Sequence, residues 1–411
     1  MTLFNAITIL VILCAVFSYI NVKLIRLPNN IALMLMSVTM SISILVLGKF
    51  GLDFSHLRQL VGGFSFSNFL MEYLLCFLLF AGALHVDFEI LKSQKWAVLI
   101  FTLFGVLFST FMIGFVLHWV APLLGFSIPL IYCLLFGALI SPTDPIAVLG
   151  ILKQAKVPKS EEIIISGESL FNDGVGVVVF LTILQLSGSG VAEINYLEIA
   201  KLFGVEVIGG VFLGFILGFF GDKILGSIDH YQTEVMLTLA IVMGGYALAS
   251  VLHTSGPLAM VVAGLYIGNV GLHRSMSNIT QQYVTTFWEI IDELLNAFLF
   301  VIIGLEILTI EDLSKFSIIA FVSILIVLLM RFLSIIIPFK FGRFKKKINK
   351  NFPYIMTWGG LRGGISIALA LSLPESDYKD VLVAITYITV LFSVVVQGLS
   401  LGMLVNYFKT K

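Results

Sequence analysis

Charged residues are scarce in this sequence. Asp, Glu, Lys and Arg make up 12% of its 411 residues, whereas soluble globular proteins contain about 25%. Hydrophobic residues account for 59%, and the mean hydropathy is +1.07. These values exclude an ordinary soluble domain and predict a membrane protein in contact with lipids. The formal net charge is zero. It gives no indication of a charged partner, and nucleic acid is not expected to be one.

Cysteine is also rare. Its three positions, Cys14, Cys76 and Cys133, all lie in apolar segments. This pattern predicts small packing residues and excludes both a disulfide framework and a cysteine metal site. No basic residue precedes the first apolar run, so a cleaved signal peptide is not expected. The sequence has no low-complexity segment and only short polar stretches between apolar runs. We therefore expect one membrane unit over 1–411, without a soluble regulatory domain.

Long apolar runs dominate the sequence. Many of them reach the ~20 residues that a helix needs to cross a bilayer. They are continuous rather than alternating, which argues against a β-barrel. We predict an all-α polytopic membrane protein with about thirteen transmembrane helices. The predicted spans are 3–21, 30–48, 68–86, 96–119, 128–151, 162–186, 201–221, 234–252, 256–270, 287–308, 316–338, 354–373 and 381–406.

The distribution of basic residues predicts the orientation. If the N-terminus lies outside, most of the 24 Lys and Arg residues fall in loops on the inner side. Cytoplasmic loops carry such an excess. We therefore predict a multi-pass protein of the cell membrane with its N-terminus outside and its C-terminus in the cytoplasm. The basic run 340–350 is an ordinary topology signal in this interpretation, with anionic lipid binding as a secondary role.

Two predicted spans carry helix-breaking residues. Pro142 and Pro145 interrupt the fifth span, and Gly360 and Gly363 flank Arg362 in the twelfth. With 3–186 as a first repeat, 201–221 as a linker helix and 234–406 as a second repeat, both breaks occupy the fifth helix of a half. Broken helices at matching positions of inverted halves indicate the binding site of a transporter. The alternative is two kinked helices without a ligand.

Two carboxylates lie in the apolar interior of these segments. Asp144 is in the fifth span and Asp173 in the sixth. A charge near the bilayer centre costs at least ~2.5–3.5 kcal/mol, so it needs a partner, water or an ion. Ser169 lies on the same helical face as Asp173, while Glu168 and Asn172 share the next face. Together with the hydroxyl and carbonyl of Thr143, these oxygens suit a hard monovalent cation such as Na⁺ or Li⁺. A proton competes for the same carboxylate.

Other functional classes explain less of the sequence. An intramembrane aspartyl protease also uses two aspartates, but no Gly-x-Gly-Asp stretch occurs here. A serine hydrolase would need a nucleophile motif such as Gly-x-Ser-x-Gly, which is absent as well. A cation channel could use the same polar groups to line a pore. The paired breaks favour a carrier over a pore.

Three motifs resemble those of a known family. They are Thr143-Asp144-Pro145, the stretch 167–173 (Gly-Glu-Ser-Leu-Phe-Asn-Asp) and the stretch 359–363 (Gly-Gly-Leu-Arg-Gly). In this order they resemble the signatures of monovalent cation:proton antiporters of the NhaP/NHE type. The resemblance implies an NhaA-like fold of two inverted six-helix repeats with crossed broken helices. It also implies homodimers and elevator-like exchange, with no cofactor besides the transported ions. The core domain would comprise helices in 96–186 and 316–406, and the dimerisation domain those in 3–86 and 234–308.

The resemblance also assigns roles to residues. Asp173 would carry the cation or proton, with Asn172 beside it, and Asp144, Thr143 and Ser169 would help to bind the ion. Electrogenic relatives carry a second aspartate at the position of Asn172, so we predict electroneutral one-for-one exchange.

Two further expectations concern other buried positions. Glu168 is expected to form a structural ion pair with Arg331, or alternatively with Arg362. Ala81 stands where the resemblance implies an acidic residue in many relatives, and Glu72 is too distant to be assumed a substitute. The choice among Na⁺, Li⁺ and K⁺ therefore stays open.

Overall fold

The computed structural model describes residues 3–50, 74–144, 148–150, 152, 157–188, 196–308, 310, 313–342 and 348–409. These residues form helices, apart from connecting segments and one isolated antiparallel bridge. The all-helical class is therefore confirmed. The α-helices are α1 Leu3–Ile20, α2 Asn29–Lys49, α5 Leu75–Leu84, α6 Phe88–Val120, α7 Leu130–Ile140, α9 Lys159–Gly188, α10 Tyr196–Leu225, α11 Tyr231–Val251, α12 Gly256–Tyr266, α13 Leu272–Ser275, α14 Asn278–Glu306, α15 Ser317–Phe341, α16 Phe352–Trp358, α17 Gly364–Leu371, α18 Lys379–Phe392 and α19 Gly398–Lys409.

Eight helical segments in the described part of the chain are long and apolar enough to cross a membrane. A helix suits this environment because it satisfies its own backbone hydrogen bonds. The predicted total of thirteen spans and the inverted repeats remain predictions, because shorter helices such as α5, α7 and α12 fall below that length.

Several helices begin at a polar cap. Asp87 accepts a hydrogen bond from Ile90 N at the start of α6, and Ser277 accepts one from Thr280 N at the start of α14. Such caps bind amide groups that the first turn leaves unpaired. Both helices therefore begin about eight residues earlier than their apolar runs indicate.

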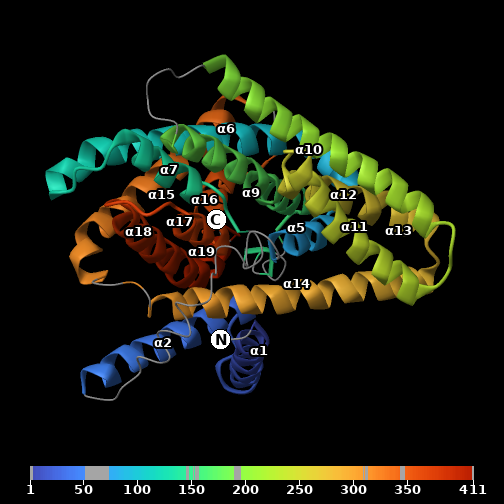
Figure 1. Ribbon diagram of the computed structural model, residues 1–411, viewed down its shortest axis with the longest axis horizontal. Helices are drawn as coiled ribbons and strands as arrows, with labels where there is room; N and C mark the ends of the chain where they lie inside the picture. Colours follow the sequence, from blue (N-terminus) through green and yellow to red (C-terminus); the bar gives the residue numbers. More distant parts are fainter. Residues whose placement is uncertain are drawn as a thin grey trace.

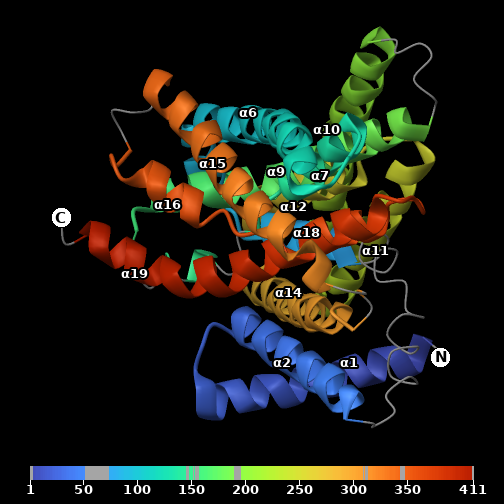
Figure 2. The same ribbon diagram turned by 90° about the vertical axis from the view of Figure 1, so that its left-hand side faces the viewer.

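Figure 1 shows α14 running across the molecule, with α1 and α2 on one side of it and the other helices on the opposite side. The view in Figure 2 has the same separation, and α2 packs directly on α14. On the larger side, α6 packs against α7, α9 and α15, while α12 packs against α5 and α10. The buried core runs through both groups.

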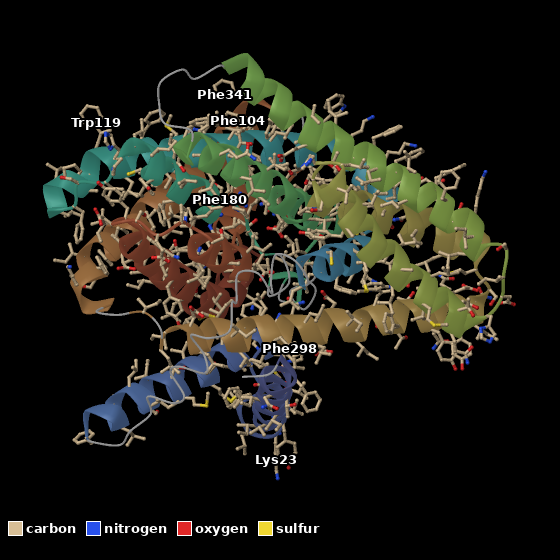
Figure 3. All side chains as sticks on the ribbon, viewed as in Figure 1. Lys23, Phe104, Trp119, Phe180, Phe298 and Phe341 are labelled. Atoms are coloured by element: carbon tan, nitrogen blue, oxygen red, sulfur yellow. The ribbon has the colours of Figure 1, made fainter. Side chains whose placement is uncertain are left out.

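The periphery is apolar. Trp119 on α6 and Phe341 on α15 are 76% and 87% exposed, whereas Phe180 is fully buried (Figure 3). Large exposed apolar side chains also follow one another along α10. A surface of this kind is unfavourable in water and suits lipid or a protein partner.

Candidate functional site

Two interrupted helices meet at the centre of the molecule. Helix α7 ends at Ile140, and an extended segment follows to Asp144. In the second interrupted helix, α16 ends at Trp358 and α17 begins only at Gly364. The two interruptions cross each other. Asp144 N donates to Leu361 O at 2.7 Å, which forms the isolated bridge between the two segments. Of the two predicted break-forming prolines, Pro142 lies in this segment and Pro145 lies outside the described residues.

Arg362 binds the carbonyl groups of the opposite break. Its Nη1 donates to Ser141 O at 2.5 Å and to Pro142 O at 3.1 Å. A backbone carbonyl group without a hydrogen bond costs on the order of several kcal/mol inside a membrane, because no water is there to replace the bond. A buried guanidinium therefore stabilises the break of α7. Arg362 therefore does not form the alternative predicted ion pair with Glu168, whose partner is Arg331.

The crossing leaves no room for side chains at two glycines. A Cβ on Gly363 would lie 2.9 Å from the Cβ of Asp144, and one on Gly360 would lie 2.8 Å from Nε of Arg331. Both distances are shorter than van der Waals contact. The close approach of neighbouring atoms thus favours glycine at both positions.

A buried polar network joins α9 to the break of α7. The carboxamide of Asn172 accepts from Thr143 N at 3.2 Å and donates from Nδ2 to Thr143 Oγ1 at 2.8 Å and Glu168 Oε1 at 2.9 Å. The hydroxyls of Thr143 and Ser169 are 3.0 Å apart. All four side chains are at most 2% exposed. The network fixes the extended segment against α9.

Glu168 is also paired with Arg331 on α15. Nη1 and Nη2 of Arg331 donate to the two carboxylate oxygens at 2.8 and 3.0 Å. This two-pronged geometry is the strongest form of such a contact. Thr143 Oγ1 lies 3.3 Å from Glu168 Oε2 as well. The pair connects α9, α15 and the break in one cluster.

Asp144 and Asp173 differ from the network because they face a cavity of about 560 Å³. Asp173 is 8% exposed, and within the described residues no hydrogen-bond donor contacts its carboxylate. Two negative charges facing one cavity are unfavourable unless a cation or proton offsets part of the charge. The arrangement can therefore bind either species.

The cavity extends from these carboxylates to the surface. Its other polar lining residues include Ser166 and Ser366, and it reaches the exposed side chains of His85 and Glu289. Its lining residues come from the segment that follows α7, from α9 and α17, and from α5 and α14. An ion from solution thus has a route to Asp173.

The structure divides the predicted site residues into two groups. Asp144 and Asp173 line the cavity, and Gly363 lines it beside them. Thr143, Ser169 and Asn172 lie behind it in the hydrogen-bonded network. We infer that in this conformation these three hold the segment that carries Asp144.

Sequence reasoning missed part of the cavity wall. Asp292, Asn296 and Ser366 line the cavity but are not among the predicted site residues. The signal for the first two was their spacing of four residues, which places them on one face of α14. Ala81 is fully buried on α5, and Glu72 lies outside the described residues.

The chain is similar to known proteins in sequence and in fold. The family model described as "Sodium/hydrogen exchanger, transmembrane" matches residues 9–407. The Na⁺/H⁺ antiporter NhaP of Pseudomonas aeruginosa is 47% identical over 96% of this chain and 94% of its own length. The Na⁺/H⁺ antiporter NhaH of Halobacillus dabanensis is 33% identical over 97% of each chain. The sodium proton antiporter MjNhaP1 from Methanocaldococcus jannaschii, at pH 8, has the same fold with a TM-score of 0.78 at 21% identity, covering 98% of this chain and 97% of that one.

Proposed function

Because the chain belongs to the sodium/hydrogen exchanger family, we propose that it exchanges Na⁺ for H⁺ across the cell membrane. Members of this family are transporters. The observation that carries the proposal is the cavity that leads from the surface to Asp144 and Asp173. Asp173 binds Na⁺ or H⁺ in turn, and Asp144 adds negative charge beside it. Since one ion displaces the other, binding from alternate sides of the membrane produces exchange.

We further propose an elevator movement. The core domain, with helices in 96–186 and 316–406, moves against the dimerisation domain, with helices in 3–86 and 234–308, and the protein works as a homodimer. The position of the cavity between these two groups of helices supports the proposal. With the N-terminus outside and the C-terminus in the cytoplasm, the cavity lies on the cytoplasmic side of Asp173.

Exchange in proteoliposomes tests the proposed function. We expect Na⁺ to drive proton movement, reported by a pH-sensitive dye. Because Na⁺ and H⁺ compete for one carboxylate, the apparent KM for Na⁺ should rise by up to about tenfold for each pH unit of acidification. Parallel runs with Li⁺ and K⁺ identify the preferred cation. Exchange with K⁺ alone would make the protein a K⁺/H⁺ antiporter, and bulk conductance would make it a cation channel.

One-for-one exchange has an electrical consequence. Asn172 is an amide and keeps its three hydrogen bonds within the network, so Asp173 is the carboxylate next to it that can change its charge. We therefore expect no sustained Na⁺-driven current from reconstituted protein on solid-supported membranes. If each transport cycle moved one net elementary charge across the membrane, the membrane potential would change its free energy by about 2.3 kcal/mol per 100 mV. A sustained current that reverses with the Na⁺ gradient would contradict electroneutral exchange.

A further inference from the structure

The α14 wall of the cavity is acidic. Glu289, Asp292 and Asn296 follow one another along one face of the helix and line the cavity opposite Asp173. The carboxylates that line it are Asp144, Asp173, Glu289 and Asp292, while the described lining residues include no Lys or Arg. The negative charge of these residues therefore attracts cations into the cavity before they reach Asp173.

Asn296 lines this cavity and, within the described part of the chain, has an unpaired, buried side-chain oxygen. Its Nδ2 donates to Asp292 O at 2.7 Å and to Asp292 Oδ1 at 3.0 Å. Both partners are acceptors only, so the atom that makes these contacts is the amide nitrogen, and the carbonyl oxygen is left for another donor or a cation. The side chain is 1% exposed, and Oδ1 has no hydrogen-bond partner among the described residues. Leaving such an acceptor unpaired is unfavourable.

The carboxylate of Asp292 and the amide oxygen of Asn296 favour a cation over water as their ligand. A carboxylate and an amide carbonyl, one helical turn apart, are oxygen ligands of the kind that hard cations prefer. A water molecule would satisfy Asn296 Oδ1 but would not offset the charge of Asp292. A monovalent cation does both.

We propose that Asp292 and Asn296 form a second cation site on α14, where the transported cation binds before it moves across the cavity to Asp173. The site rests on the proposed exchange function and adds a step to it. It supplies a partly dehydrated cation at the wall that faces Asp173. The site therefore raises the affinity for cations that arrive from this side.

Two substitutions test the site. Asp292→Asn removes the charge at nearly constant shape, and Asn296→Leu removes the orphan oxygen at similar volume. In everted membrane vesicles, whose outer face is the cytoplasmic one, we expect each to raise the apparent KM for added Na⁺ by roughly five- to tenfold. The maximal rate should stay within about twofold, because Asp173 is untouched.

Glu293 on the same helix provides the matched control. It is exposed and lines a different depression, beside Arg26 and the end of α1. Glu293→Gln should leave the KM unchanged. Unchanged KM in both Asp292→Asn and Asn296→Leu, or an equal rise in Glu293→Gln, would overturn the site while the exchange function stands. Absence of Na⁺/H⁺ exchange in the unsubstituted protein would instead overturn the proposed function.

Discussion

Replacing Asp173 by Asn is expected to abolish exchange while the protein stays folded. The amide has nearly the same volume as the carboxylate, but it carries no charge and releases no proton near neutral pH. Removing one partner of a buried ionic contact costs about 3–5 kcal/mol, which corresponds to a loss of at least roughly 100-fold in cation binding. The helix itself should tolerate the change, because no described residue donates a hydrogen bond to Asp173.

The measurement is Na⁺-driven proton movement in proteoliposomes with equal amounts of each variant. Asp380→Asn is the control, because Asp380 is an exposed carboxylate in the first turn of α18, away from the cavity lining. It should exchange at the rate of the unsubstituted protein. Undiminished exchange by Asp173→Asn would remove Asp173 from its proposed role. Loss of the single symmetric peak of the folded protein in size-exclusion chromatography would show that the substitution acts on folding instead.

The features that were predictable from the sequence are those with a local physical cause. Proline in a helix interior removes a hydrogen bond and glycine weakens a helix, so the clusters of these residues indicated the interruptions at Pro142 and between Gly360 and Gly363. A single proline is a weaker signal, since Pro338 lies inside α15. A carboxylate in an apolar run is costly wherever the chain folds. The penalty marked Asp144 and Asp173 before any partner was known. The all-helical class followed from the continuous apolar runs in the same way.

Features that depend on which helices meet were not predictable in this way. Arg362 binds carbonyl groups of the segment that contains Pro142, more than two hundred residues away in sequence. The spacing on α9 placed Ser169 and Asn172 near Asp173, but it could not decide which side chains face the cavity. The approach of the α7 break decides that, because Thr143 occupies the hydrogen-bonding groups of Asn172.

Substitution of Arg331 should have the largest effect on stability. Arg331→Met leaves Glu168, which is 1% exposed, as an uncompensated buried carboxylate. We expect a loss of about 3–5 kcal/mol in the free energy of unfolding. Adding Glu168→Gln should recover most of it, because the amide keeps an oxygen for Asn172 and no longer needs a counter-charge. Thermal unfolding in detergent, followed by the fluorescence of the four Trp residues, measures the single and double variants.

The ion pair between Lys379 and Glu375 is the matched control. Its 2.7 Å contact is as short as that of Arg331 and Glu168, but the Glu375 side chain is 90% exposed. Water already stabilises the carboxylate there, and the Lys379 side chain is itself 20% exposed. Lys379→Met should therefore cost at most about 1 kcal/mol. Equal melting temperatures for Arg331→Met and the unsubstituted protein would contradict a structural role for the buried pair. A stable Glu168→Gln/Arg331→Met double variant that still exchanges Na⁺ for H⁺ would separate the two functions of α9. Glu168 would then hold the break of α7 in place, and Asp173, five residues later, would bind the ion.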